Sequence, residues 1–358
     1  MFSADYGEAR RRFLEACRKA GATPVSHDHP DLGPRGETLA TDSVWFGPED
    51  AATVLVLISA THGVEGFCGS AAQTAWIESG GWKALPPDAA VLVIHALNPF
   101  GFAWLRRVTG EGVDLNRNFI DFTGALPTNP GYAELADDLL PDALDPQTLA
   151  AADARLAAYA ERHGETAYEI AVSGGQYTHP DGLFYGGAGP TPARLAVEGL
   201  IHRHRLAGRT RVCVIDFHTG LGPYGHGEVI CDHAPGSLGA RLAKAWFGAA
   251  VTEPALGTST SVPKAGLSDY GWQRMLGDRV VFVALEFGTF DVPAMFRALR
   301  ADHRLHRRGP PDWDAAETRR VKAAIRDFFY PDADDWKAMV AETSRRVIDQ
   351  ALAGLAAD

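Results

Sequence analysis

Four short apolar runs, spread along the chain, constrain its fold more than any other feature. They are VLVLISA (54–60), VLVIHAL (91–97), VCVIDF (212–217) and VVFVALEF (280–287). Continuous apolar runs of this length are typical of strands buried on both faces of a sheet. Helical patterns lie before, between and after them, at about 5–20, 70–78, 146–163, 191–206, 237–248, 291–306, 314–329 and 334–356. Strands that alternate with helices predict a three-layer α/β/α fold around a mixed, mostly parallel sheet.

Length and composition favour one large globular unit. The chain has 358 residues, of which 46% are hydrophobic and 22% are charged, the balance of an ordinary globular enzyme. It contains no internal repeat, low-complexity tract or linker. We therefore expect a single α/β domain over residues 1–358, with C-terminal helices from about residue 310.

Net charge, apolar runs and cysteine spacing indicate the class of partner and the cellular location. A formal net charge of −11 argues against binding to nucleic acid or to an anionic membrane surface. No run approaches the roughly 20 apolar residues of a membrane span, and the N-terminus lacks the apolar core of a secretory signal. The four cysteines are scattered and form no CxxC pair, which favours reduced thiols in a cytoplasmic protein. Nothing in the sequence indicates an oligomeric state.

Residues that can bind a metal follow two of the predicted strands. His62 and Glu65 come just after the first strand, and His218 follows the third. Sites in α/β sheets form beyond the carboxyl ends of the strands, so these side chains can meet. Two histidines and one carboxylate leave a fourth position for water, as in catalytic zinc sites, and Asp216 could orient one ligand. On its own, however, an HxxE pair is commonly a chance match, and a histidine after a strand is usually a surface group.

Further segments give these residues a context. They are Asn98-Pro99-Phe100-Gly101, the pair Arg106-Arg107, and DLNRN at 114–118, followed by a late strand that carries Glu286. In this order the chain resembles the M14 metallocarboxypeptidase superfamily, and especially its bacterial branch DUF2817, over about residues 54–290. The resemblance implies a zinc carboxypeptidase-like fold that binds one Zn²⁺ ion through His62, Glu65 and His218.

The resemblance also implies roles for the other matching residues. Glu286 matches the general base that takes a proton from the activated water. Arg107 matches the arginine that stabilises the developing oxyanion, with Arg106 as a close competitor. Asn116 and Arg117 match the pair that binds the terminal carboxylate of the substrate, for which a planar guanidinium is suited.

Each of these roles has a structural alternative. Glu286 could be a strand-end carboxylate, although a charge inside VVFVALEF is costly to bury without a function. Asp114 is expected to shape the turn or to orient Arg117. Arg106 could equally be an exposed cation.

Two loops remain open to interpretation. The segment 173–187 is rich in glycine and aromatic residues, and we expect Gln176 and Tyr177 to line the substrate pocket. A structural turn with buried aromatic side chains is the alternative. The segment 261–276 offers Tyr270, Lys264 and Ser261, and no motif singles out one of them.

A second metal site is a weaker hypothesis. His226, Glu228 and His233 follow His218 closely in the sequence. Histidines at such intervals in a glycine-rich loop are also compatible with a substrate-lining or surface segment.

The leading functional hypothesis is hydrolysis of an amide bond next to a free carboxylate by a metal-activated water. The substrate would be a small peptide or an N-acyl amino acid, and the latter would make the protein an aspartoacylase-like deacylase. A non-catalytic binding protein would be expected to lose Glu286 or a ligand, and this chain keeps them all. A serine hydrolase is disfavoured because the chain has no GxSxG motif.

Overall fold

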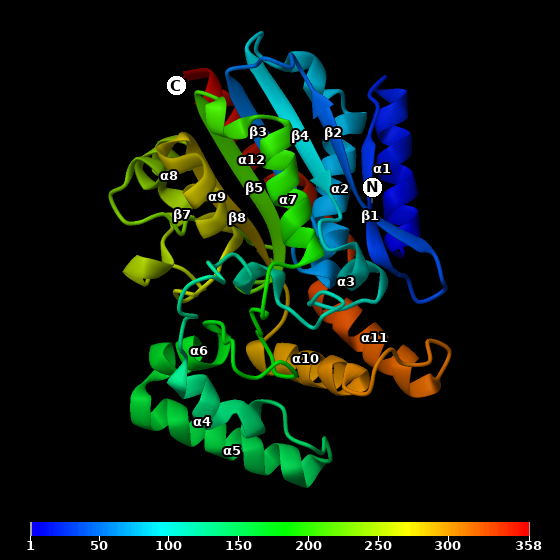
Figure 1. The fold of residues 1–358 in the computed structure, drawn as a ribbon, viewed down its shortest axis with the longest axis vertical. Coiled ribbons are helices and arrows are strands. Elements are labelled where there is room, and N and C mark those ends of the chain that lie inside the picture. Colours follow the sequence, from blue (N-terminus) through cyan, green and yellow to red (C-terminus); the bar gives the residue numbers. More distant parts are fainter. Residues whose placement is uncertain (1, 358) are drawn as a thin grey trace.

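The computed structural model describes residues 2–357, which form an eight-stranded mixed sheet covered by helices (Figure 1). The strand order is β1-β2-β4-β3-β5-β8-β6-β7. The strands are β1 (Val25–Leu32), β2 (Thr38–Phe46), β3 (Thr53–Ile58), β4 (Ala89–His95), β5 (Arg211–Gly220), β6 (Gly227–Ile230), β7 (Val251–Thr252) and β8 (Val280–Gly288).

The four apolar runs form the centre of this sheet. They correspond to β3, β4, β5 and β8, which are adjacent and parallel to one another. The strands β1, β2 and β6 add antiparallel pairings at the two sides. The prediction of a mixed sheet with a parallel centre is therefore confirmed.

Helices cover both faces of the sheet, as Figure 1 shows for α7 in front and α12 behind. One face packs against α1 (Tyr6–Lys19), α2 (Gly66–Glu78), α8 (Leu238–Phe247) and α12 (Asp334–Ala357). The other packs against α7 (Pro192–Arg203) and α9 (Ser268–Leu276). Alternate strand residues divide between the two cores: Leu55 and Leu57 face the first group, whereas Val54 and Val56 face the second. This alternation follows from the two-residue period of a strand, and it produces the expected three layers.

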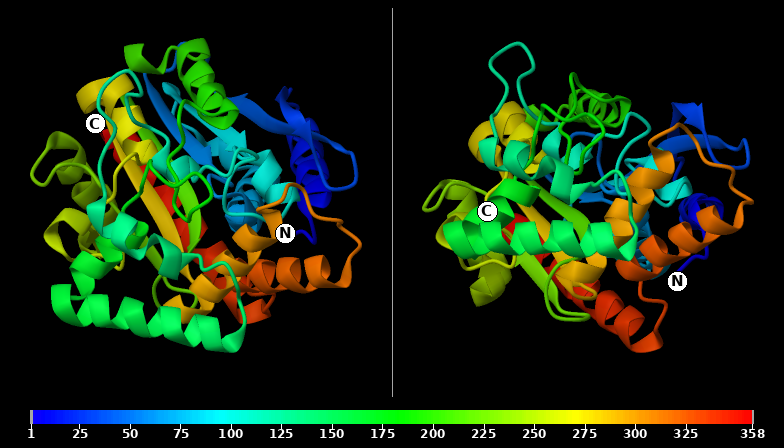
Figure 2. Two further views of the ribbon diagram at one scale, coloured as in Figure 1. Left: turned by 60° about the horizontal axis from the view of Figure 1, so that its bottom comes forward. Right: turned by 90° about the horizontal axis from the view of Figure 1, so that it is seen from below.

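A further group of helices gathers at one end of the sheet, at the bottom of Figure 1. Figure 2 turns this end toward the viewer. It consists of α4 (Pro130–Leu139), α5 (Pro146–His163), α6 (Glu165–Ser173), α10 (Val292–His306) and α11 (Ala316–Phe329). These helices share a third apolar core, to which the short α3 (Pro99–Ala103) region contributes Leu105. Arg300 of α10 fastens the group by donating to the carbonyl oxygens of Leu139 and Asp138, at 2.8 and 3.0 Å.

No helix within residues 2–357 is both long enough and apolar enough to cross a membrane. The four cysteines are buried, and none of them forms a disulfide.

Candidate metal and catalytic site

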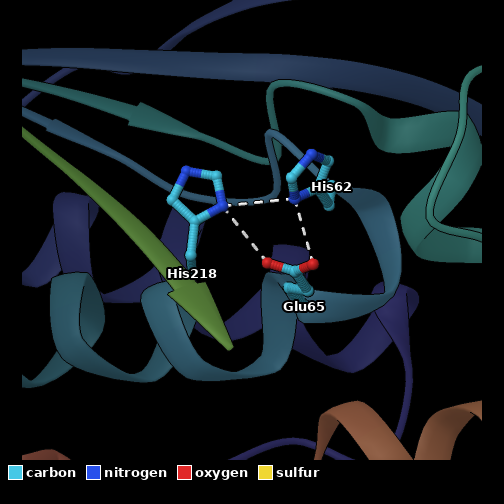
Figure 3. Close-up of side chains that lie close together, drawn as sticks. All are labelled: His62, Glu65 and His218. Carbon is cyan, nitrogen blue, oxygen red and sulfur yellow. Dashed lines mark hydrogen bonds and ion pairs between the residues drawn. The ribbon is translucent and has the colours of Figure 1, made fainter. Parts of the chain in front are cut away.

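Three side chains from two distant segments converge at the carboxyl end of the sheet (Figure 3). His62 and Glu65 belong to the connection between β3 and α2, and His218 lies near the end of β5. Nδ1 of His62 is 3.2 Å from Nδ1 of His218 and 3.0 Å from Oε1 of Glu65. Nδ1 of His218 is 3.2 Å from Oε2 of Glu65. All three residues are buried, and their predicted convergence is confirmed.

Each histidine turns its second ring nitrogen toward a carboxylate. Nε2 of His62 is 3.0 Å from Oδ1 of Asp114. Nε2 of His218 is 3.0 Å from Oδ2 of Asp216, an ion-pair distance without the alignment of a hydrogen bond. Asp216 is itself held by the hydroxyl of Thr61, which donates to Oδ1 at 2.8 Å. Carboxylates in such positions fix the orientation of metal-binding histidines.

The geometry of these three side chains fits a single metal ion. A tetrahedral ion with ligands at about 2.0–2.1 Å places its ligand atoms about 3.3 Å apart. The facing atoms of His62, Glu65 and His218 are separated by 3.0–3.2 Å, close to that value. Two imidazole nitrogens and a carboxylate directed at one point form a donor set that could hold a metal.

Close backbone packing explains the glycine that lies between His62 and Glu65. A Cβ atom on Gly63 would lie 2.0 Å from the carbonyl carbon of Gly101, so neither backbone leaves room for a side chain between them. The amides of Gly63 and Val64 donate to the carbonyl oxygens of Arg107 and Arg106, at 3.2 and 2.8 Å. The segment between His62 and Glu65 is thereby held against the segment that carries the arginine pair.

Of the two adjacent arginines, only Arg107 reaches the site. Its Nη1 donates to Oε1 of Glu65 at 2.9 Å, and its Nε donates to Oδ2 of Asp114 at 3.1 Å. Its Nη2 is 2.9 Å from Nε2 of His62. Arg106 points away and donates to Oδ2 of Asp302 at 2.9 Å. The structure thus favours Arg107, and Arg106 is a buried cation rather than an exposed one.

Glu286 lies directly beside a metal-binding candidate. In the parallel pairing of β5 with β8, it stands opposite His218. Its Oε1 accepts a hydrogen bond from the amide of Leu221 at 2.9 Å. Burial raises the pKa of Glu286 to about 7, and the nearby Glu65 carboxylate acts in the same direction. A carboxylate that titrates near neutral pH can both accept and return a proton.

These residues open onto a cavity of about 290 Å³. His62, Arg107, His218 and Glu286 line one wall. Side chains from α6 and α10 line another, so the end group of helices roofs the site. The roof residues are Glu165, Tyr168, Glu169, Val172 and Ser173 of α6, and Val292, Met295 and Phe296 of α10.

Asn116 and Arg117 also line the cavity. The guanidinium of Arg117 donates to the carbonyl oxygen of Ser173 through Nε at 3.1 Å and Nη2 at 2.8 Å, and to that of Asn116 through Nη1 at 2.6 Å. The side-chain oxygen of Asn116 accepts from the amide of Ser268 at 2.8 Å. Three of the five N–H groups of Arg117 are thus used to hold the surrounding backbone, which leaves two for a ligand.

Gln176 and Tyr177 do not line the cavity. The amide of Gln176 is occupied within its own loop: Nε2 donates to the carbonyl oxygen of His179 at 2.8 Å, and Oε1 accepts from the amides of Thr178 and His179. The hydroxyl of Tyr177 donates to the carbonyl oxygen of Arg117 at 2.6 Å. The structure corrects the prediction that these residues line the pocket and favours the alternative, a structural turn that supports Arg117.

The residues considered for a second metal are dispersed. Glu228 accepts hydrogen bonds from the hydroxyls of Thr252 and Ser259, at 2.5 and 2.8 Å. Nε2 of His233 is 2.9 Å from the amide of Phe282, and His226 is exposed. Within residues 2–357, only His62, Glu65 and His218 form a group suited to a metal.

Sequence reasoning missed Glu165, Glu169 and Asp232 of the cavity, and it did not single out Lys264. Burial raises the pKa of Asp232 to about 6. Lys264 stood among three loop residues without a signal to distinguish it, whereas Tyr270, its neighbour in that segment, does not line the cavity. Only the folded loop shows which of them faces the ligands.

The fold is similar to that of bovine thrombin-activatable fibrinolysis inhibitor in complex with tick carboxypeptidase inhibitor, with 14% identity, a TM-score of 0.47 and coverage of 98% of each chain. It is similar to a metallo-carboxypeptidase from Burkholderia cenocepacia, with 15% identity, a TM-score of 0.44 and coverage of 95% of this chain and 68% of that chain. It is similar to succinylglutamate desuccinylase from Chromobacterium violaceum, with 14% identity, a TM-score of 0.38 and coverage of 90% of this chain and 74% of that chain. No curated protein matches the sequence. A family model matches residues 2–343, nearly the whole chain, and the protein therefore belongs to the family DUF2817, described as "Protein of unknown function".

Proposed function

We propose that this protein is a zinc-dependent hydrolase that cleaves an amide bond next to a free carboxylate. The observation that carries the proposal is the arrangement of the metal-binding candidates and the base. His62, Glu65 and His218 converge on one point, and Glu286 stands opposite His218 on the adjacent strand. Two histidines and one carboxylate are the ligands of several hydrolytic zinc sites.

The residues divide the chemistry among themselves. Zinc bound to the three ligands would polarise the scissile carbonyl and lower the pKa of water. Glu286 takes the proton of the attacking water and passes it to the leaving amine, a role that its position opposite His218 on the adjacent strand permits. Arg107 donates to the carbonyl oxygen as negative charge develops there. Asn116 and Arg117 hold the carboxylate of the leaving amino acid at the cavity wall.

The size of the cavity supports a small substrate. Its volume of about 290 Å³ lies just below the range of about 300–1,000 Å³ for small-molecule pockets. The roof formed by α6 and α10 restricts its extent. We infer that the substrate is a short peptide or an N-acyl amino acid.

Metal analysis and a substrate panel test the proposal. The purified protein should contain about one zinc ion per chain and should hydrolyse members of a panel of dipeptides and N-acetyl amino acids, and removal of zinc with a chelator should abolish that activity. Glu286→Gln should retain zinc but lower kcat by about 10²–10⁴-fold. Glu78→Gln, at an exposed position at the end of α2, is the matched control and should leave kcat unchanged. A protein without stoichiometric zinc whose activity resists chelation would contradict the proposal.

A further inference from the structure

One ammonium group in the cavity has no charged partner. Lys264 lines the cavity, and its Nζ donates to the hydroxyl of Ser261 and to the carbonyl oxygen of Val262, the latter at 2.8 Å. Both acceptors are neutral and belong to the same loop. Within residues 2–357, no carboxylate oxygen lies within the ion-pair distance of 4.0 Å from this Nζ. Two hydrogen bonds leave the third N–H of the ammonium for another acceptor.

The surroundings of Lys264 favour the arrival of an anion. Arg117 and Arg107 repel its charge, whereas Asp232 and Glu286 attract it from beyond ion-pair distance. Burial, reinforced by Arg117, lowers the pKa of Lys264 to about 7. A partly desolvated cation next to two guanidinium groups is costly unless it gains a counter-charge. A negatively charged ligand group would provide one.

Two hydrogen bonds made by the backbone of its loop hold Lys264 near the residues expected to bind the substrate carboxylate. The amide of Ser268 donates to Oδ1 of Asn116 at 2.8 Å. The carbonyl oxygen of Gly266 accepts from the amide of Phe119 at 3.1 Å. The loop that carries Lys264 is thus fastened on both sides of Arg117. Arg117 donates three of its N–H groups to carbonyl oxygens and has two left for a ligand. A second cation at this wall would supply a further donor and a further positive charge for a bound carboxylate.

We propose that Lys264 binds the terminal carboxylate of the substrate together with Asn116 and Arg117. The proposal rests on the function proposed above and deepens it, because it assigns a binding residue to the leaving amino acid. The ammonium acts as a point charge with one free donor, whereas Arg117 contributes its two remaining N–H groups.

The test compares Lys264→Met and Lys264→Arg on two substrates. One is an N-acyl amino acid with a free carboxylate, and the other is the same compound with that carboxylate converted to a primary amide. Lys264→Met should raise KM for the free carboxylate about 10- to 100-fold, the effect of losing a charge-assisted hydrogen bond, and should leave kcat within about threefold. KM for the amide should change little, and Lys264→Arg should retain most of the affinity. An unchanged KM for the free carboxylate in Lys264→Met would overturn the proposal.

A double variant excludes a purely internal role. If Lys264 served only to neutralise Asp232, then adding Asp232→Asn to Lys264→Met would restore the KM of the wild type. The proposal expects KM of the double variant to remain at least tenfold above that of the wild type. Full restoration would assign Lys264 to Asp232 and overturn the carboxylate role.

Binding measurements separate this proposal from the proposed hydrolysis. Calorimetry on the zinc-loaded protein measures Kd for free L-leucine and for L-leucinamide. Suppose that the protein cleaves no amide but that Lys264→Met weakens leucine binding at least tenfold. The carboxylate role of Lys264 would then stand, and the hydrolase assignment would be wrong. If the protein cleaves amides but neither KM nor Kd depends on Lys264, the hydrolase assignment stands and the carboxylate role of Lys264 is overturned.

Discussion

Arg106 and Arg107 are adjacent in the sequence, yet they enter two different buried charge clusters. Arg106 belongs to what we call the closed cluster: Asp302 accepts from Arg106 and, at 2.5 Å, from Lys322, whose Nζ is also 2.8 Å from Nε2 of His306. Arg107 belongs to the open cluster with Asp114, His62 and Glu65. No member of the closed cluster lines the cavity, whereas His62 and Arg107 of the open cluster do.

This difference in position suggests different roles: the closed cluster stabilises the fold, and the open cluster serves the proposed chemistry. Burial alone would raise the pKa of Asp302, but Lys322 and Arg106 hold it below its usual range, so its charge is matched within the cluster. The closed cluster joins α10 and α11 to the segment after α3. The open cluster borders the cavity, so its groups are accessible to a bound molecule. The following predictions test whether these two roles can be separated.

The largest effect is expected from breaking the closed cluster. Asp302→Ala leaves Arg106 and Lys322 buried without a counter-charge and should lower the free energy of unfolding by about 3–5 kcal/mol. Denaturant unfolding measures the loss. Zinc content and kcat/KM per folded molecule should stay close to those of the wild type.

Asp302→Asn serves as a milder variant if the alanine protein does not fold. Loss of zinc or of kcat in a variant of undiminished stability would show that the closed cluster takes part in the chemistry.

Breaking the open cluster should lower activity more than stability. Arg107→Ala removes the proposed donor to the oxyanion and should lower kcat/KM about 10²–10³-fold. It should destabilise the fold less than Asp302→Ala, because Asp114 keeps His62 as a partner. Steady-state kinetics and unfolding measured on the same preparation give both quantities. Arg107→Ala with wild-type kcat/KM would contradict the role of Arg107.

The smallest effect concerns pH and His303, which lies beside the closed cluster. Burial, reinforced by Arg106, lowers the pKa of His303 to about 4, against about 6.5 in an unfolded chain. Between these values the unfolded state binds a proton that the folded state excludes. The free energy of unfolding should therefore fall as the pH falls from about 6.5 to about 4, by up to about 3 kcal/mol from this residue.

His303→Gln should flatten that dependence, as measured by urea unfolding between pH 4.5 and 7.5. His202→Gln, at an exposed position on α7, is the matched control and should not change it. Identical pH profiles for the wild type and His303→Gln would refute the assignment.

The sequence was sufficient for the parts of the site that strand ends determine. Apolar runs specify buried strands, and parallel strands bring their carboxyl ends to one edge. Together with the family resemblance, which selected His62, Glu65, His218 and Glu286 among the polar residues at these strand ends, this allowed the four to be grouped before the fold was known. The spacing to Asn116 put Arg107 first but left Arg106 as a close competitor, because the directions of these two adjacent side chains depend on the backbone conformation after α3. Leu105, which has a φ of 49° there, carries no sequence signal for that conformation.

Loops were harder to interpret for a related reason. Gln176 and Tyr177 have the polar tips of ligand-binding residues, but their hydrogen bonds go to backbone groups of the loop and of Arg117. Conversely, Lys264 looked ordinary in the sequence, and only the loop closure between Asn116 and Ser268 brings it to the cavity. The helices α4 and α6 were not predicted; they have only 10 and 9 residues, too few for a clear helical pattern.

The pairing of His218 with Glu286 across β5 and β8 has a consequence for how relatives of this protein can diverge. Neighbouring strands lie about 4.8 Å apart, a spacing set by backbone hydrogen bonds and independent of side chains. The separation between His218 and Glu286 is thus set by the sheet and does not have to be rebuilt when surrounding loops change. Insertions in the roof helices or in the Lys264 loop can alter the shape of the cavity while these two residues keep their distance.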